Sequence, residues 1–369
     1  MPDEHARLSP SASHRWLACP GSVPWEATLP DEGSEAAAEG TAAHLLAEAR
    51  LKNDADLLRE AQSSPYYCEA MESAIDTYVD YIHELTTKDA QRYIEQRLAI
   101  FPPDCWGTSD CVICAEDTLH VVDLKYGKGV RVEAKENPQC ILYAWGALNE
   151  FGFLYDFKHV EMHIVQPRLD NITRWAISTS ELGQRIARIL PKVEAAREAA
   201  NAGEGDLCAG EHCRFCKAAG RCAARARYAV ILLLNAIEDE RECTNASIGK
   251  ILTALPAVET WAKGIKDGAF DAALHGDRIP GFKLVAGRST RKISDCDEAA
   301  RRLIAEGFAP DQIMELRGLT DLERAVGKKE LAHILEDVIV KGDAKPTLVK
   351  DSDPRSEYCA ASQDFTTIE

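Results

Sequence analysis

The chain has 369 residues, enough for one large domain or two ordinary ones. Hydrophobic residues make up 46% of it and charged residues 28%, which is the range of globular proteins. The formal net charge of −17 argues against a protein that binds nucleic acid through general basicity. It leaves room for a local basic groove, and for carboxylates that hold a cation.

The sequence carries no sign of a targeting or membrane segment. The opening MPDEHARLSPSASHRW has no apolar core, and the apolar run YAVILLLNAI at 228–237 is too short to span a bilayer. A cytoplasmic protein without a membrane partner is therefore expected. In that compartment the 13 cysteines are expected to be metal ligands and buried thiols rather than disulfides.

The hydrophobic pattern first predicts two helices and then three strands. Helical spacing predicts an Ala-rich helix over 35–50 and a second helix over 67–87. The period then changes to alternation, which predicts three antiparallel strands over 92–101, 107–117 and 118–127.

The next segments return to helix and strand. A helix over 137–152 opens with Asn-Pro and closes with Gly. Strands are predicted over 159–168 and 174–179, and a long helix over 180–203 that Pro191 interrupts.

The C-terminal third is predicted to be mostly helical. A buried helix over 225–237 and an amphipathic helix over 245–276 come first. Residues 279–293 are predicted to be extended and 295–341 to be helical, and the polar stretch from about 351 to be a loose tail.

A D-x-K pattern lies on the third predicted strand. Asp123 and Lys125 are two residues apart, so their side chains face the same way. Asp110 stands at the start of the preceding predicted strand, and a hairpin would bring it close to Asp123. Two carboxylates and an ammonium on one surface suit a divalent cation such as Mg²⁺, with the lysine orienting or activating a water. The alternative is that Asp123 and Lys125 are ordinary charges on a wet strand face.

Several motifs follow one another in a recognisable order. G-x-x-D at 107–110 precedes D-x-K at 123–125, and Q-x-x-x-Y at 139–143 lies on the next helix. With EGTAAHLLAE and the N-terminal LSPSASHRWLACPGS, they resemble the PD-(D/E)XK nuclease superfamily in its RecB/Cas4-like branch, over roughly residues 8–230. Val122 replaces the proline of the strand motif, a departure common in the branch. Over its whole length the chain resembles the phage and prophage DUF2800 proteins.

The resemblance implies an α/β (α+β) fold with a restriction-endonuclease-like core, in which helices flank a central mixed sheet. It implies His44, Asp110, Asp123 and the main-chain carbonyl of Leu124 as ligands of Mg²⁺ or Mn²⁺. Asp110 and Asp123 would act in catalysis with Lys125, the catalytic lysine. Gln139 and Tyr143 would face the active site and the DNA backbone, and Glu95 would contribute indirectly.

Three cysteines form a C-x2-C-x5-C pattern in CRFCKAAGRC: Cys213, Cys216 and Cys222. The resemblance implies that Cys19 joins them to hold a structural [4Fe–4S] cluster, which would staple the N-terminal region to the end of the nuclease core. Two alternatives remain. Cys208 extends the pattern to a local zinc knuckle, with His212 as a further candidate ligand, or the thiols carry no metal.

Seven further cysteines are expected to be non-ligands: Cys105, Cys111, Cys114, Cys140, Cys243, Cys296 and Cys359. Cys111 and Cys114 form a C-x2-C pair, but on a strand their side chains point to opposite faces.

Three regions are expected: a nuclease domain with the cysteine cluster at 1–230, a mostly helical domain at 231–350 and a flexible tail at 351–369. The most basic stretch lies in the second region, and its candidate phosphate contacts are Arg278, Lys283, Arg288, Arg291 and Lys292. The alternative is a solvated loop with scattered charge.

The expected function is that of a metal-dependent DNA nuclease, an exonuclease, acting in phage DNA recombination, repair or replication in the bacterial cytoplasm. The alternative is a non-catalytic DNA-binding or recombination scaffold that keeps the fold. A thiol oxidoreductase is disfavoured, because no strand–CxxC–helix context is present. The expected partner is DNA. A second copy of the chain and a phage single-strand-binding or recombination protein are further candidates.

Overall fold

The computed structural model describes residues 6–30, 33–236, 244–283, 285, 296–305, 327, 331 and 333–335. The chain divides into two units, residues 1–285 and 286–369. In the second unit the described helix is α10 (Cys296–Ala305). Most of the helix predicted over 295–341 and the tail predicted from 351 lie outside the described residues. The predicted domain boundaries at 230 and 350 stay predictions.

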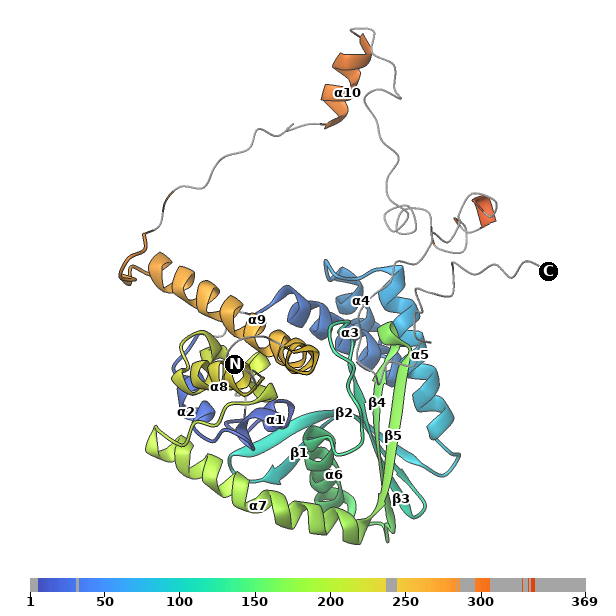
Figure 1. Ribbon diagram of the computed structural model, residues 1–369. Helices are drawn as coiled ribbons and strands as arrows, with labels where there is room; N and C mark the ends of the chain where they lie inside the picture. Colours follow the sequence, from blue (N-terminus) through green and yellow to red (C-terminus); the bar gives the residue numbers. More distant parts are fainter. Residues whose placement is uncertain are drawn as a thin grey trace, which may run out of the picture. The chain divides into compact units, whose positions relative to one another are not determined.

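A five-stranded mixed sheet forms the centre of the first unit (Figure 1). Its strands lie in chain order: β1 (Gln91–Phe101), β2 (Cys105–Ala115), β3 (Thr118–Leu124), β4 (His159–Gln166) and β5 (Asn171–Ser178). The pair β3–β4 is parallel, and the other neighbours are antiparallel. The prediction of three antiparallel strands, a helix and two further strands is confirmed.

Helix α6 (Pro138–Phe151) makes the connection that parallel strands require. Its N-terminus is encoded locally, because the Asn137 side chain accepts hydrogen bonds from the amides of Gln139 and Cys140. Pro138 occupies the first turn, where no amide hydrogen is needed.

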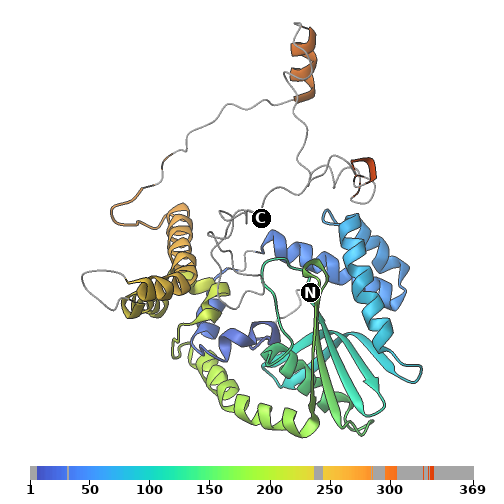
Figure 2. The ribbon, with the colours of Figure 1, turned by 45° about the vertical axis from the view of Figure 1, so that its right-hand side comes forward.

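Helices cover both faces of the sheet (Figures 1 and 2). One core cluster joins the sheet to α6 and α7 (Thr179–Ala202), and the other joins it to α3 (Glu35–Lys52), α4 (Ala55–Ser63) and α5 (Glu69–Leu85). Strand alternation divides the residues of β2 between these clusters. Cys111 packs with α3 and α5 and Cys114 packs with α6, as the period of two predicts.

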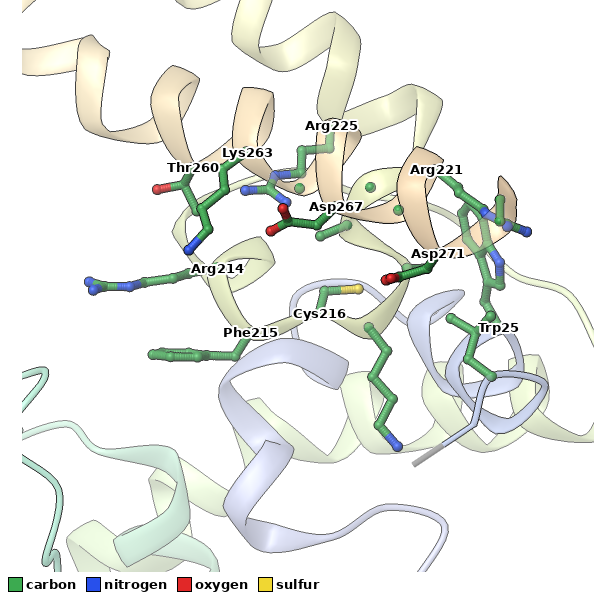
Figure 3. Close-up of a pocket in the computed structure, with 18 of the residues that line it drawn as sticks. Trp25, Arg214, Phe215, Cys216, Arg221, Arg225, Thr260, Lys263, Asp267 and Asp271 are labelled. Carbon is green, nitrogen blue, oxygen red and sulfur yellow. The ribbon is translucent and has the colours of Figure 1, made fainter. Parts of the chain in front are cut away.

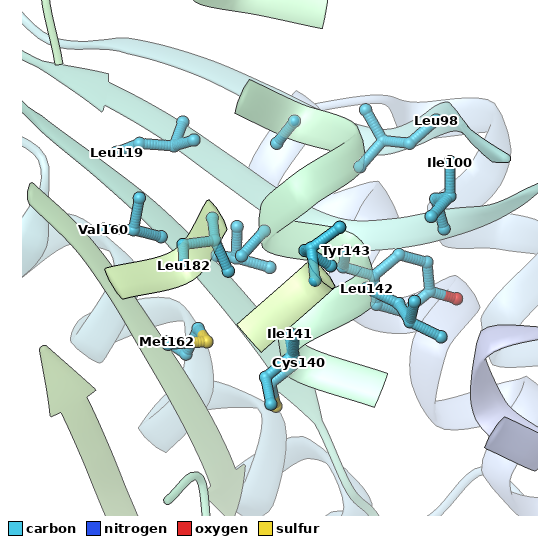
Figure 4. Packing of buried hydrophobic residues seen from close by; sticks show 14 of the residues in the cluster. Leu98, Ile100, Leu119, Cys140, Ile141, Leu142, Tyr143, Val160, Met162 and Leu182 are labelled. Atoms are coloured by element: carbon cyan, nitrogen blue, oxygen red, sulfur yellow. The ribbon is translucent and has the colours of Figure 1, made fainter. Parts of the chain in front are cut away.

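Helix α6 packs closely on the sheet (Figure 4). A Cβ atom on Gly146 would lie 2.8 Å from Cγ1 of Ile100 and 3.1 Å from Cβ of Leu98, both on β1. Glycine at this position therefore lets the helix approach the strand.

The long helix α7 runs from Thr179 to Ala202 as one element with Pro191 inside it, so the predicted interruption is wrong. Proline removes one helical hydrogen bond, and the helix has other support. Its buried residues on both sides of the proline pack into the core, among them Leu182, Ile186 and Val193. A Ser178–Glu181 capping box fixes its start.

Helix α8 (Ala223–Ala236) lies beside α9 (Asn245–Leu274). The prediction of a buried helix is wrong for its described part, because Val230, Ile231 and Leu234 are exposed. An apolar run predicts burial only where another element covers it, and in the described structure these three side chains are not covered.

The N-terminal segment packs against the stretch that follows α7. It contains the short helices α1 (Ser13–Trp16) and α2 (Ser22–Ala27). The Gly21 amide donates to the carbonyl of Asp206, and a Cβ on Gly21 would lie 2.3 Å from the carbonyl oxygen of Gly205. Two backbones about 185 residues apart therefore touch at a point that glycine allows.

Four 3₁₀ segments complete the described elements: Pro10–Ala12, Pro167–Leu169, Glu211–Phe215 and Lys217–Gly220. Among the described residues, no helix is long and apolar enough to cross a membrane.

The Gly146 contact predicts a stability difference between two helical glycines. Gly146→Ala should lower the free energy of unfolding by about 1–3 kcal/mol, because the added methyl group overpacks the contact with β1. Gly183→Ala is the matched control: apart from its own stretch of helix, nothing lies within 4 Å of a Cβ added there, so it should raise that free energy by up to about 1 kcal/mol. Urea denaturation measures both. Equal stabilisation by the two changes would contradict the close packing of α6.

Candidate functional site

Three carboxylates occupy one row across three strands. The pairing of Cys111 with Val122 puts Asp110 opposite Asp123, and the pairs on either side of Glu95 put Glu95 opposite Asp110. Asp110 lies in the middle of β2, so the prediction that it starts that strand is wrong. Like charges directly opposite one another destabilise a sheet. This row therefore needs compensating positive charge.

His44 of α3 offsets the negative charge of Asp110. Its Nδ1 lies 3.1 Å from Oδ1 of Asp110, and the Leu124 amide donates to Oδ2 at 2.7 Å. The negative charge of Asp110 raises the pKa of His44 to about 9. Burial favours protonation of Asp110, but pairing with His44 outweighs it and lowers the pKa of this carboxyl. The two side chains thus form an ion pair at neutral pH.

Lys125 and Gln139 hold Asp123, which is 4% exposed. Nζ of Lys125 lies 2.7 Å from Oδ2, and Nε2 of Gln139 donates to Oδ1 at 2.7 Å. Burial raises the pKa of Asp123 despite the lysine beside it. Burial would lower the pKa of Lys125, but the charge of Asp123 prevails and raises it. The structure therefore brings Asp123, Lys125 and Gln139 together.

Glu95 belongs to the same site. It has a left-handed backbone with φ of 53°, a conformation that is uncommon outside glycine. Burial and the nearby Asp110 raise its pKa to about 7. Ligand atoms of His44, Glu95 and Asp110 all lie within 4.8 Å of one another, so these three side chains could hold a metal ion.

The sequence predicted only an indirect role of Glu95 in the active site, and it predicted that Asp123 is a ligand of the metal ion. Asp123 is not one of the three side chains of this compact group, and its two oxygens contact Lys125 and Gln139. Strand register is the signal that identifies Glu95. A role for the Leu124 carbonyl stays a prediction.

Tyr143 lies inside the protein, 6% exposed in the core cluster under α6. Its hydroxyl approaches β2, where a Cβ on Gly107 would lie 2.9 Å from it. Burial raises its pKa, followed by the charges of Asp123 and Asp110. The residue is therefore near the carboxylates while it packs as a core side chain.

Two buried amide side chains, those of Gln166 and Asn171, hold the loop between Lys125 and α6 in place. Oε1 of Gln166 accepts from the Val132 amide at 2.7 Å, and its Nε2 donates to the carbonyl of Val130. Asn171 donates to Gln166 and to the carbonyl of Val132. Nothing in the spacing of these residues singled them out, because their partners are main-chain atoms about 35 to 40 residues away.

The structure brings Cys19 to the C-terminal cysteines. Cys19, Cys213, Cys216 and Cys222 all line one small cavity. The Cys208 amide lies 3.4 Å from Sγ of Cys19, and the Gly210 amide lies 3.5 Å from Sγ of Cys213. Cys208 also borders the cavity, but it is exposed.

Local donors favour thiolates at two of these cysteines. Burial would raise the pKa of Cys19 and of Cys213, but His212 and the main-chain amides prevail and lower both. Hydrogen bonding to Cys19 and Cys213 raises the pKa of His212 to about 10. Burial raises the pKa of Cys216 to about 12.

The remaining cysteines differ in their surroundings. Cys68 is exposed. Cys105, Cys111, Cys114 and Cys140 are buried core residues, as expected. Cys243 and Cys359 lie outside the described residues, and Cys296 begins α10.

A cavity of about 900 Å³ adjoins the cysteine region (Figure 3). Arg214, Arg221, Arg225 and Lys263 line it with Glu259, Asp267 and Asp271, so its charge is mixed. The described residues among the predicted DNA contacts do not line this cavity. Arg278 and Lys283 are exposed beyond α9, and Arg288, Arg291 and Lys292 lie outside the described residues.

The charge state of the site predicts a pH-dependent metal affinity. Without metal, His44 holds a proton below about pH 9 and Glu95 below about pH 7, and a metal ligand must lose it. The logarithm of the Mn²⁺ association constant should therefore rise by about 2 per pH unit below pH 7 and by about 1 per unit from pH 7 to 9. Titration calorimetry measures it. His44→Gln should flatten the upper range, and a flat wild-type profile there would contradict the assignment.

Comparison with known proteins places the chain in a family. The family model for DUF2800, described as a protein of unknown function, matches residues 5–356. Among solved structures, a "putative exonuclease" from Eubacterium rectale is 12% identical, over 55% of this chain and 84% of that chain, with a TM-score of 0.35. SSO0001 is 14% identical, over 61% of this chain and 89% of that chain, with a TM-score of 0.30. Since the family match spans nearly its whole length, the protein belongs to the DUF2800 family.

Proposed function

We propose that this protein is a divalent-metal-dependent DNA nuclease that hydrolyses phosphodiester bonds. The observation that carries the proposal is the row of Glu95, Asp110 and Asp123, faced by His44 and Lys125. A scaffold protein gains nothing from three buried or half-buried carboxylates in adjacent strands, because each costs desolvation energy. A nuclease uses such a group to hold a cation beside a phosphate.

The donor set fits a hard divalent ion. His44, Glu95 and Asp110 would supply an imidazole nitrogen and carboxylate oxygens, which suit Mn²⁺ and Mg²⁺. A bound ion of this kind activates a water and neutralises charge on the phosphate. Asp123 would become a further metal ligand once its side chain no longer contacts Lys125 or Gln139.

The protein's own residues prepare the rest of the chemistry. Asp123 keeps the Lys125 ammonium charged and close to the carboxylates, where it can offset the charge of a phosphate. Gln139 orients Asp123 from the other side, so the carboxylate cannot rotate freely. Glu95 shares the row with Asp110 and would have to lose its proton to hold the ion.

The finer proposals concern the substrate and the setting. We expect an exonuclease that acts on DNA ends, in phage recombination, repair or replication, because the RecB/Cas4-like motifs resemble end-processing enzymes. Arg278 and Lys283, both exposed, are the described residues proposed to contact phosphates.

We propose a [4Fe–4S] cluster at the cysteines, held by Cys19, Cys213, Cys216 and Cys222. Their shared cavity and the amide donors to two of the sulfurs support it. Around a single zinc ion, neighbouring sulfurs lie about 3.8 Å apart. Among the described residues, no three ligand atoms of the cysteine group are within 4.8 Å of one another, which favours the larger cluster.

Substitution of the site residues tests the nuclease proposal. Asp123→Asn and Lys125→Met should each lower the rate of hydrolysis of end-labelled linear DNA at least about a hundredfold, because each removes a charge from the reaction centre. Asp117→Asn and Lys128→Met are matched controls, a turn acid and an exposed lysine that should leave the rate unchanged.

Two outcomes of this assay would be decisive. Full activity of folded Asp123→Asn and Lys125→Met would refute the assignment of the site. If covalently closed circular DNA is cleaved as fast as linear DNA, the protein is an endonuclease and the exonuclease proposal is wrong.

Metal analysis of cysteine variants tests the cluster. Protein isolated without oxygen should absorb broadly near ~400 nm through thiolate-to-iron charge transfer. Cys19→Ser should lose as much iron as Cys216→Ser, since each supplies one of four bonds, whereas Cys208→Ser should keep it. Stoichiometric zinc that depends on Cys208 and not on Cys19 would establish the knuckle instead.

A further inference from the structure

A second group of potential ligands lies on the two central strands. His120 is on β3, and Glu161 and His163 are on β4. The parallel register pairs His120 with Glu161, and His163 follows two residues later, so the three side chains share one face of the sheet. Helix α5 covers this face, and its Tyr81 contacts His163.

The three side chains converge at ligand spacing. Nδ1 of His120 lies 3.1 Å from Nε2 of His163 and 3.6 Å from Oε2 of Glu161. Metal–nitrogen bonds of about 2.0–2.1 Å in a tetrahedral zinc site set neighbouring donors about 3.3 Å apart. The two observed distances fall on either side of that value, so an ion could enter with small side-chain movements.

A second layer of contacts fixes two of the ligands. Oη of Tyr81 lies 2.8 Å from Nδ1 of His163, the ring nitrogen that faces away from His120. Histidine ligands commonly use their second nitrogen in this way. Arg174 lies 3.7 Å from Oε1 of Glu161, which leaves Oε2 directed at His120.

The group combines burial with access. His163 is 0% exposed, whereas the side chains of His120 and Glu161 are 12% and 17% exposed. The donors are therefore rigid, and solvent can reach one side of them and supply a further ligand. Without an ion, the same atoms form a hydrogen-bond chain from Tyr81 through His163 to His120. This chain is the structural alternative.

We propose that His120, Glu161 and His163 form a transition-metal site of the two-histidine, one-carboxylate type that selects Zn²⁺ over Mg²⁺. Imidazole nitrogens suit zinc, whereas magnesium prefers oxygen ligands throughout. The site is separate from the carboxylate row, because His120 precedes Asp123 by three residues, about 10 Å along the strand. It would link β3 to β4, and through Tyr81 to α5. It does not depend on the nuclease proposal.

Zinc content tests the site. Metal-stripped full-length protein is dialysed against Zn²⁺ with excess Mg²⁺, which competes for the carboxylate row, and bound zinc is measured by atomic emission. His120→Gln and Glu161→Gln should each hold one equivalent less than the wild type. His159→Gln is the matched control, an exposed histidine at the start of the same strand, and should hold as much as the wild type. Any zinc that the cysteines bind is the same in the wild type and in these three variants, so it cancels in the comparison.

A fourth variant separates a ligand loss from a folding defect. Tyr81→Phe keeps all three ligands and removes the partner of His163, so it should weaken zinc affinity about tenfold or more while leaving the stoichiometry unchanged. Equal zinc content and affinity in the wild type and all variants would overturn the proposal and leave the hydrogen-bond chain as the whole role of these residues.

Discussion

Electrostatic repulsion among Glu95, Asp110 and Asp123 is the constraint that organises the first unit. Strand pairing sets the three carboxylates side by side, and the sheet forms only if positive charge and hydrogen-bond donors reach them. The helices on both faces supply those groups. His44 comes from α3 and Gln139 from α6, so each helix must dock in one position to serve the row.

The connection between the central strands explains this precision. Because β3 and β4 are parallel, the chain must cross over through α6, and the crossover sets the N-terminus of α6 above the end of β3. Gln139 stands in the first turn of that helix. Gln166 and Asn171, at the same end of the sheet as the end of β3, then hold the intervening loop. Site geometry thus follows from strand topology.

Part of this arrangement could be predicted from local sequence patterns. The D-x-K spacing predicted that Asp123 and Lys125 face the same way, and Asn137-Pro138 predicted the start of α6. Features that depend on register were not accessible in this way. Glu95 is identified only when β1 is paired with β2, and the group at His120 only when β3 is paired with β4 across an intervening helix. The exposure of α8 depends on what surrounds it, which periodicity cannot report.

The contact between Gly21 and Gly205 has a consequence for folding during synthesis. The part of the N-terminal segment around Gly21 meets its backbone partner only after about 185 further residues have been made, and the last cysteine of the group follows at Cys222. At 5–20 residues per second, the ribosome needs about 10–40 s to bring them out. We therefore expect the sheet and its flanking helices to assemble first on the nascent chain, with the Gly21 contact and Cys19 joining last. A stretch near the beginning of the polypeptide is then among the final parts of the first unit to fold.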